Sequence, residues 1–247
     1  MVAGTGERTA EGTAGAQTRA GLRVVSWNIR DLLGDPLAVH RVLRALEPDV
    51  ACLQEVPRRP GSRWQASTLA RATGLLYVAG GRDSGGTALL VSLRTEVGRA
   101  RAVRLPVGGR TTRTRGAVVA EVGLPGTGRV AVASVHLSLD ADERLRHCAA
   151  VVDLLGRTGR PPVVCGDLNE RPDGPAWRAW GDDVRDPAPG APPTFPAKGP
   201  RSRLDAVLVG SGVEVLGYGD GGVDPADVRA ASDHVPVVAV LGLPVRG

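Results

Sequence analysis

Aromatic side chains are scarce in this sequence, which contains four Trp, two Tyr and one Phe among 247 residues. Proteins that bind single-stranded nucleic acid usually stack its bases on aromatic rings, so the scarcity argues against a processive enzyme of that kind. Lysine is scarcer still, because Lys198 is the only one and arginine supplies nearly all of the basic charge. We favour a compositional bias over phosphate recognition as the reason. The net charge of +5 permits an anionic substrate without demanding nucleic acid.

Long apolar runs are absent as well. No stretch approaches the roughly 18 apolar residues of a transmembrane helix, and the N-terminus lacks the apolar core of a signal peptide. We therefore expect a disordered leader at 1–20, a single domain at 21–247 and a cytoplasmic monomer. The three cysteines form no CxxC pair, which argues against a disulfide framework or a zinc knuckle. We expect reduced, mostly buried thiols.

Short apolar runs bounded by turn residues dominate the chain. They have the length and β-branched content of strands and occur at 22–29, 49–56, 87–93, 117–124, 129–137, 162–168, 204–210 and 235–241. Strands outnumber helices, and some follow one another with no helix between them. This pattern favours an α/β fold in which two mixed sheets pack face to face with helices outside.

Three helices are predicted between the strands. Asp35 as N-cap and Pro36 at the first helical position start one of them, and the others lie at 64–73 and 141–156. The apolar face of the third helix is predicted to be Leu145, Ala149, Val152 and Leu155. The segment 182–203 is rich in Pro and Gly, which predicts a long surface loop of a kind that is often functional.

Polar side chains stand at the ends of the predicted strands, where a buried carboxylate or amide is costly unless it has a partner. In chain order they are Asn28, Glu55, His136, Asp167, Asn169, Asp205, Asp233 and His234. Each one alone has an ordinary explanation. Glu55, for example, could form a surface ion pair with Arg58. Gathered at one end of a sheet, however, these residues would form a site for a metal ion and a phosphate.

The side chains of this set suit the hydrolysis of phosphate esters. That reaction needs neutralisation of charged oxygens, an aligned water and protons for the leaving group. Mg²⁺ takes oxygen ligands, often one or two carboxylates beside waters and substrate phosphate, and Asn28, Glu55 and Asp233 could supply them. Imidazoles can donate to phosphate oxygens, while a carboxylate positions the water or takes its proton.

Seven short blocks contain these residues: SWNI (26–29), LQEV (53–56), SVHLS (134–138), GDLNE (166–170), TFP (194–196), RLDAVLV (203–209) and SDHVPV (232–237). Their residue types and order resemble the endonuclease/exonuclease/phosphatase family, which includes DNase I-like nucleases and abasic-site endonucleases. The resemblance covers nearly the whole chain after the leader. It implies a four-layer α/β/β/α sandwich and a Mg²⁺ or Mn²⁺ cofactor.

The resemblance also implies a role for each residue. Glu55 would be the principal metal ligand, with Asn28 nearby and Asp233 completing the site. Asp167 would orient or deprotonate the attacking water, and Asn169 would hold the phosphate or that water.

The two histidines would act on the substrate. His136 would donate a hydrogen bond to a phosphate oxygen or to the leaving group. Asp205 would accept a hydrogen bond from His234, fix its tautomer and keep it cationic enough to stabilise the transition state. Some nucleases of the family have a tyrosine in place of His136, and this difference points away from a strict abasic-site enzyme and toward the DNase-like or phosphatase-like members.

The implied activity is divalent-metal-dependent hydrolysis of phosphodiester bonds, with a nuclease acting on DNA or RNA slightly favoured. The alternative is a phosphatase or phosphodiesterase for a small metabolite such as a nucleotide, sugar phosphate or lipid headgroup. A catalytically silent binding module is a third interpretation, against which stands the complete set of competent residues.

Several arginines are further candidates. Arg110, Arg113 and Arg115 precede the strand predicted at 117–124. Phosphate contact at the mouth of the site and a solvated hairpin loop explain this run equally well, and Arg115 is the best candidate because it adjoins the strand. Arg144 and Arg146 on the third predicted helix are expected to be surface charges.

Overall fold

The computed structural model describes residues 19–107 and 114–246, in which the chain forms two six-stranded sheets. Sheet A has the order β11-β12-β1-β2-β4-β3 and contains β1 (Arg19–Asn28), β2 (Val50–Gln54), β3 (Leu76–Gly81), β4 (Thr87–Val91), β11 (Glu214–Gly219) and β12 (Val237–Pro244). Sheet B has the order β5-β6-β7-β8-β10-β9 and contains β5 (Glu96–Arg104), β6 (Gly116–Gly123), β7 (Arg129–His136), β8 (Pro162–Asp167), β9 (Val184–Arg185) and β10 (Asp205–Gly210).

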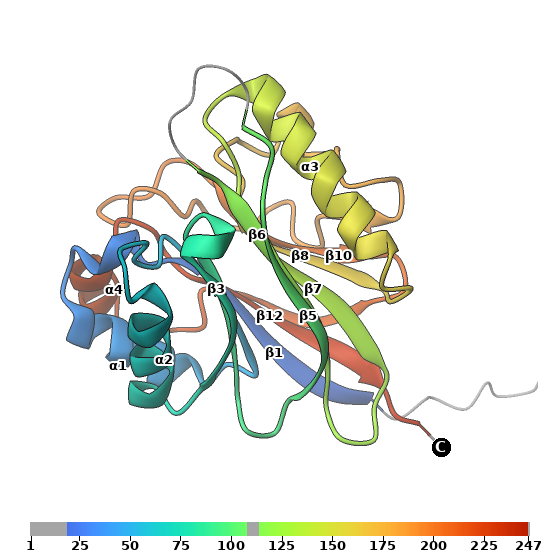
Figure 1. Cartoon of the computed structure of the whole chain (residues 1–247), viewed down its shortest axis with the longest axis horizontal. Helices are drawn as coiled ribbons and strands as arrows, with labels where there is room; N and C mark the ends of the chain where they lie inside the picture. Colours follow the sequence, from blue (N-terminus) through green and yellow to red (C-terminus); the bar gives the residue numbers. More distant parts are fainter. Residues whose placement is uncertain (1–18, 108–113, 247) are drawn as a thin grey trace, which may run out of the picture.

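Helices cover the outer face of each sheet. The described residues form α1 (Pro36–Leu46), α2 (Ser62–Ala72), α3 (Ala141–Gly156) and α4 (Pro225–Ala231), with short 3₁₀ turns at η1 (Arg30–Leu32), η2 (Arg82–Ser84) and η3 (Pro175–Trp177). Figure 1 shows α1, α2 and α4 together on one side of the molecule and α3 on the other. The predicted four-layer α/β/β/α sandwich is therefore confirmed.

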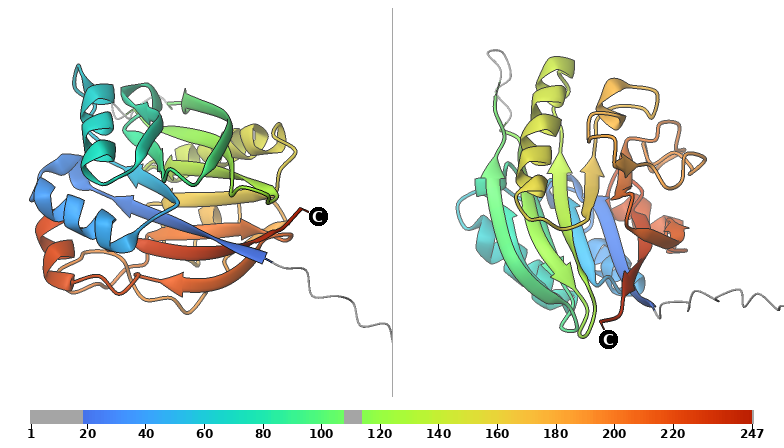
Figure 2. Two further views of the ribbon diagram at one scale, coloured as in Figure 1. Left: turned by 90° about the horizontal axis from the view of Figure 1, so that it is seen from below. Right: turned by 90° about the vertical axis from the view of Figure 1, so that its right-hand side faces the viewer.

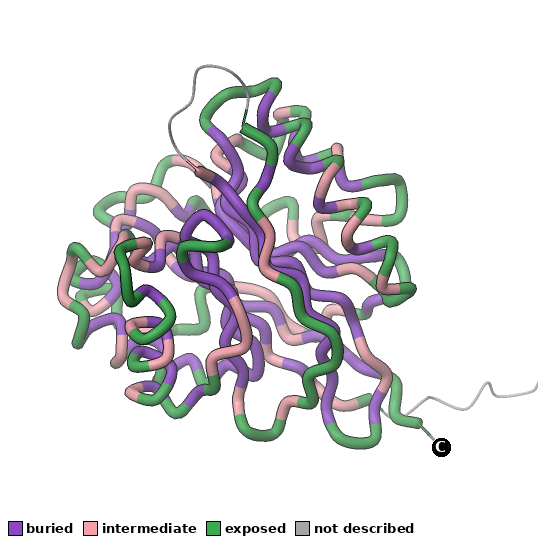
Figure 3. The backbone as a smooth tube through the Cα atoms, viewed as in Figure 1, coloured by how far each residue is buried: buried purple, intermediate pink, exposed green. Residues whose placement is uncertain are grey.

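The alternating side chains of the strands build three apolar layers. In β1, Val24 packs between the two sheets, whereas Val25 packs outward beneath α1. A third layer joins sheet B to α3, with Val151 at its centre. Figure 2 shows β1 and β12 side by side, and Figure 3 shows the buried central strands beside the exposed edge strand β5. Since a fully buried Val or Leu contributes about 1.5–3 kcal/mol, these layers fix how the two sheets align.

The bounds of α3 agree with the prediction, but only half of its predicted apolar face is confirmed, because Leu155 is buried and Val152 packs against the core whereas the other two residues do not. Leu145 and Ala149 are exposed, whereas Cys148 and Val151 are buried against sheet B and Arg144 is buried beside neighbouring loops. The buried face includes polar side chains such as Arg144, which bonds to the neighbouring loops, so apolar spacing alone could not identify the whole face. Arg144 is accordingly not a surface charge, although Arg146 is exposed as expected.

Five elements were absent from the sequence prediction: β3, β5, β9, β11 and α4. All four strands lie at sheet edges, and β5 is arginine-rich and largely exposed, so it lacks an apolar run. The α4 helix starts with Asp224 as N-cap and Pro225 after it, the same signal as in α1. The segment 182–203 contains only the short β9, but it is not wholly on the surface, since Thr194, Ala197 and Arg203 are buried.

Some predictions fall on residues outside the described ranges. Arg110 and Arg113 lie there, as do residues 1–18 of the predicted leader, whose last two residues belong to β1. No helix in the described part of the chain is both long and apolar enough to cross a lipid bilayer.

The three thiols provide a test of the packing. Cys52, Cys148 and Cys165 are free and 0% exposed, and burial raises the pKa of the Cys148 thiol to about 12. Because the reactive form is an accessible thiolate, we expect Ellman's reagent to label none of them in the native protein. All three should react after denaturation in guanidinium chloride. Stoichiometric labelling of the native protein within seconds would contradict this packing.

Candidate functional site

The register of sheet B aligns three of the predicted site residues in one row. Asp205 on β10 pairs with Asp167 on β8, and Asp167 in turn pairs with His136 on β7. Because β7 and β8 are parallel, both end at this row. Side chains alternate along a strand, so directly paired residues point to the same face, here toward sheet A.

Sheet A contributes the opposite half of the site. Asn28 ends β1 and pairs with Gln54 at the end of the parallel strand β2, which places Glu55 immediately beyond. The antiparallel strand β12 starts beside the end of β1. Asp233 and His234, which lie a few residues before β12, therefore reach the same end of the sandwich. The structure thus brings all eight predicted residues to this end.

The carboxylate of Asp167 lies at the centre of the group and is 2% exposed. Its Oδ2 accepts a hydrogen bond from Asn28 Nδ2 at 3.1 Å, and its Oδ1 accepts one from the backbone N–H of Asn169 at 2.9 Å. The Nε2 atoms of His136 and His234 lie 3.4 and 3.8 Å from Oδ2. One buried carboxylate therefore touches residues from both sheets.

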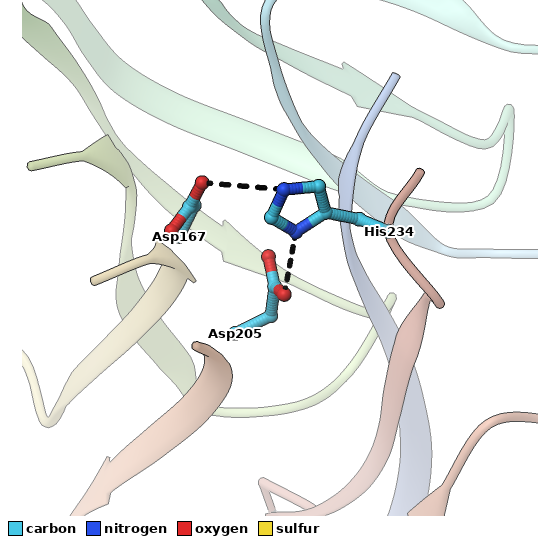
Figure 4. A group of neighbouring side chains, drawn as sticks. All are labelled: Asp167, Asp205 and His234. Atoms are coloured by element: carbon cyan, nitrogen blue, oxygen red, sulfur yellow. Dashed lines mark hydrogen bonds and ion pairs between the residues drawn. The ribbon is translucent and has the colours of Figure 1, made fainter. Parts of the chain in front are cut away.

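Asp205 and His234 form a tight pair, with 2.8 Å between Oδ2 and Nδ1. The same Oδ2 accepts a hydrogen bond from Thr194 Oγ1 at 2.6 Å. In Figure 4 the imidazole of His234 lies between the carboxylates of Asp205 and Asp167. Burial lowers the pKa of His234, but the two carboxylates outweigh it and raise the pKa to about 9. Burial and the charge of Asp205 raise the pKa of Asp167 to about 6.

Neighbouring residues fix the position of His234. Its backbone carbonyl accepts a hydrogen bond from Trp27 Nε1 at 2.9 Å, and its N–H donates to Ser232 Oγ at 3.1 Å. Ser232 Oγ in turn donates to the carbonyl of Asn28. The ring of Phe195 packs on the imidazole at a centroid distance of 4.8 Å. The imidazole is thus held by β1 and by the segment 194–196.

The partner of His136 determines which of its nitrogens carries a proton. Arg115 is 5% exposed, and its Nη1 lies 2.9 Å from His136 Nδ1. A guanidinium has only donors, so Nδ1 must accept and the proton must be on Nε2. That Nε2 lies 3.4 Å from Asp167 and 4.0 Å from Glu55 Oε1. The predicted contact of Arg115 with substrate phosphate stays a prediction.

Two of these residues have a left-handed backbone, a conformation that is unfavourable for residues other than glycine because of their Cβ atom. Glu55 has φ 51° and Asn169 has φ 50°. Such a conformation costs of order 1 kcal/mol or more, persists only when the surroundings impose it, and clusters at functional sites. The Glu55 side chain is 31% exposed. It makes no ion pair with Arg58 among the described residues, so the ordinary explanation of Glu55 is not realised.

Two groups of ligands could hold a metal ion. The ligand atoms of Asp167, Asp205 and His234 lie within 4.8 Å of one another. However, an imidazole with protons on both nitrogens has no lone pair for a metal, and the raised pKa of His234 favours that form. The oxygens of Asn28 and Glu55, which hard cations prefer, fit a divalent metal better. Asp233 is further out, with a 39% exposed side chain 3.7 Å from Arg30 Nε.

Several residues that build the site have no predicted role. Thr194, Phe195 and Ser232 belong to quoted sequence blocks, but no role was assigned to them. Their signal was position next to the predicted residues, since Ser232 lies two residues before His234. Trp27, similarly, directly precedes Asn28. Thr194 supplies the hydrogen bond to Asp205 from eleven residues away, a contact that only the fold reveals.

The architecture defines a layered α/β sandwich, and sequence comparison identifies the family of the chain. The model of the endonuclease/exonuclease/phosphatase family matches residues 25–234. The chain therefore belongs to the endonuclease/exonuclease/phosphatase family, which supports phosphoester hydrolysis as its class of reaction. No curated protein matches the sequence.

Solved structures support the same fold. An endonuclease/exonuclease/phosphatase from Beutenbergia cavernae is 26% identical, with a TM-score of 0.69 over 92% of this chain and 72% of that chain. The Bacteroides thetaiotaomicron mannosyl-6-phosphatase is 19% identical, with a TM-score of 0.74 over 89% and 99%. D. rerio TDP2 in complex with a single-strand DNA product is also 19% identical, with a TM-score of 0.72 over 90% and 99%.

The two histidines should differ in protonation, and nitrogen-15 NMR can test this difference. At neutral pH we expect His136 to have a protonated Nε2 and an unprotonated Nδ1, because Arg115 donates to Nδ1. His234 should have protons on both nitrogens, since its pKa is about 9. Long-range proton–nitrogen spectra report these states, and a His136→Gln variant assigns the signals. A protonated Nδ1 on His136 would contradict the bond to Arg115.

Proposed function

We propose that this protein hydrolyses phosphodiester bonds with Mg²⁺ or Mn²⁺, through Asn28, Glu55, His136, Asp167, Asn169, Asp205, Asp233 and His234. The observation that carries the proposal is the arrangement around Asp167. Its buried carboxylate contacts an amide from sheet A, an amide N–H from sheet B and two imidazoles. A carboxylate that only stabilises the fold seldom has two imidazoles beside it, whereas titratable groups are commonly clustered in this way at catalytic sites.

Glu55 and Asn28 would hold the divalent cation, with Asp233 at the outer edge. Their oxygens are the ligand type of Mg²⁺ and Mn²⁺, and Glu55 has no competing ion pair with Arg58. Asn28 Oδ1 already accepts the backbone N–H of Arg30 at 3.0 Å, which fixes the orientation of its amide. When bound, the cation supplies a positive charge that neutralises phosphate oxygens.

Asp167 and Asn169 would prepare the attacking water. The pKa of Asp167 is raised to about 6, which leaves a carboxylate at neutral pH that is basic enough to accept a proton from water. The backbone N–H of Asn169 and the amide of Asn28 hold this carboxylate in place. Asn169 lies two residues after Asp167, in the loop that follows β8, and can orient the water or the phosphate.

His136 and His234 would bind the oxygens on which charge develops. His136 offers the proton on Nε2 because Arg115 occupies Nδ1. His234 offers Nε2–H as a cation, because Asp205 holds Nδ1–H at 2.8 Å. Donors that are fixed before the reaction stabilise a transition state without the cost of reorganisation. One of the two can also protonate the leaving oxygen.

The substrate follows less directly from the site. A polynucleotide is slightly favoured, and the net charge of +5 permits an anionic substrate of this kind. His136 in place of a tyrosine points away from a strict abasic-site enzyme and fits DNase-like and phosphatase-like members equally. A small phosphorylated metabolite is the alternative. The similar structures include both a mannosyl-6-phosphatase and a protein bound to a DNA product. The monomeric state and the cytoplasmic location stay predictions.

A substrate panel with a metal-ligand variant tests the proposal. We expect the purified protein to cleave plasmid DNA or RNA with Mg²⁺ or Mn²⁺ and to lose this activity in EDTA. Glu55→Ala should reduce turnover at least about 100-fold, because loss of one charged contact to the transition state commonly costs 10²–10³.

Glu47→Ala is the matched control, since Glu47 is exposed and shares the left-handed backbone of Glu55, with φ 44°. If the protein turns over only nucleotides or sugar phosphates in the same panel, the nuclease proposal is wrong and the alternative, an enzyme for a small phosphorylated metabolite, is supported. Cleavage that persists in EDTA would reject the metal-dependent mechanism.

His234 provides a second test. We expect His234→Ala to lower turnover by about 10²–10³ while circular dichroism shows a folded protein, because the lost group acts on the substrate. His40→Ala is the control, since His40 is a half-buried histidine on α1, away from the site. Near-normal turnover of His234→Ala would remove this residue from the mechanism.

A further inference from the structure

Arg144 on α3 is a buried charged residue that the mechanism above does not use. It is 8% exposed, and its guanidinium makes three hydrogen bonds. Nη1 donates to the carbonyls of Ser138 at 3.0 Å and Leu139 at 2.8 Å, and Nη2 donates to Glu170 Oε1 at 2.8 Å. Ser138 and Leu139 follow His136, whereas Glu170 follows Asn169. One side chain therefore joins the two loops that carry residues of the site.

Glu170 is itself fixed in position. Its second carboxylate oxygen accepts the backbone N–H of Ala176 at 2.5 Å, and its backbone carbonyl accepts Trp177 Nε1 at 2.8 Å. A Cβ atom at Gly174 would lie 2.2 Å from the carboxylate carbon of Glu170. Only glycine leaves room there for this carboxylate, so the Arg144–Glu170 ion pair is a built feature with a defined geometry.

Asn169 makes a second connection between the same two loops. Its Nδ2 donates to the carbonyl of Leu137 at 2.8 Å, one residue from the Ser138 carbonyl that Arg144 binds. The left-handed backbone of Asn169 must be held by its surroundings. Two parallel links, one from the Asn169 side chain and one from Arg144 through Glu170, supply this restraint.

We propose that Arg144 is a positioning residue that sets the relative placement of His136 and Asn169 by clamping the loops after β7 and β8. The inference rests on the proposed function, which gives those two residues their contacts with the phosphate. A displacement of about 1 Å in a catalytic group can cost about 10²-fold in rate. The clamp therefore acts on turnover without touching substrate.

The clamp joins the loops after β7 and β8 of sheet B. Its effect on kcat can therefore be distinguished from a general loss of structure. The Arg144 guanidinium bonds to Ser138, Leu139 and Glu170, whereas the proposed metal ligands Asn28 and Glu55 lie at the end of β1 and just after β2 in sheet A. Disturbing the clamp should reduce kcat and leave the metal affinity unchanged. Unfolding or loosening of the sandwich would reduce both.

Two variants disturb the clamp by different routes. Arg144→Lys keeps the charge but cannot bridge both loops with a planar fork, and Gly174→Ala pushes a methyl group against Glu170. With bis(p-nitrophenyl) phosphate we expect each to lower kcat about 10- to 100-fold. Mn²⁺ affinity, measured by electron paramagnetic resonance, should stay within about 2-fold. Arg146→Met is the matched control, because Arg146 is exposed on the same helix.

A double-mutant cycle with Asn169→Ala tests whether Arg144 acts through Asn169. If it does, Arg144→Lys should lower kcat by a smaller factor in the Asn169→Ala background than in the wild type, because only its effect on His136 remains and coupled residues are non-additive. Full additivity, or a fall in Mn²⁺ affinity that parallels the fall in kcat, would overturn the proposal.

Hydrogen exchange separates this proposal from the proposed function. The backbone N–H of Asn169, bound to Asp167 Oδ1, should exchange at least about 10-fold faster in both clamp variants than in the wild type and in Arg146→Met. This readout needs no turnover, so a wild-type protein without hydrolytic activity would contradict the proposed function and leave the clamp measurable. Unchanged exchange at Asn169 in both variants would refute the clamp.

Discussion

The buried carboxylate of Asp167 is the group on which the arrangement of the whole site depends. A charge at this depth is costly unless donors surround it, and the donors come from separate parts of the chain. Asn28 reaches it from sheet A, while the backbone of Asn169 reaches it from the loop after β8. The two sheets must therefore align to within hydrogen-bond distance at this end. The apolar layer between them supplies that alignment, because a slip of one residue would turn alternate side chains away.

The same end of the sandwich holds two imidazoles in different protonation states, and their partners set the difference. His136 faces Arg115, which can only donate, so its Nδ1 must be unprotonated. His234 faces the carboxylate of Asp205, which accepts, so its Nδ1 must be protonated. Each histidine thereby presents an N–H on Nε2 toward the same carboxylate, one neutral in this bonding pattern and one cationic. A donor at one Nδ1 and an acceptor at the other therefore have the same effect, because both leave an Nε2–H donor directed toward Asp167.

The sequence predicted the polar residues at the strand ends better than the residues that hold them in position. Strand ends could be predicted because the central strands are continuously apolar, and a polar residue such as Asn28 or Asp167 marks where each one stops. The edge strand β5 lacks that contrast, because its exposed faces carry arginines. Arg144 was assigned to the surface because a charged residue on a helix usually lies there. Its burial depends on carbonyls of the loop after β7 and on Glu170, contacts that no local pattern encodes.

Glu55 and Asn169 show how the scaffold and the site depend on one another. Each follows a central parallel strand, β2 in sheet A or β8 in sheet B, by one or two residues, and each has a left-handed backbone. This conformation ends the extended chain abruptly, so the side chain stays at the rim where the two sheets meet. Neither is glycine, although glycine would adopt the conformation without strain. At Asn169, the backbone N–H bond to Asp167 and the side-chain bond to the carbonyl of Leu137 hold this conformation and keep the amide at the rim.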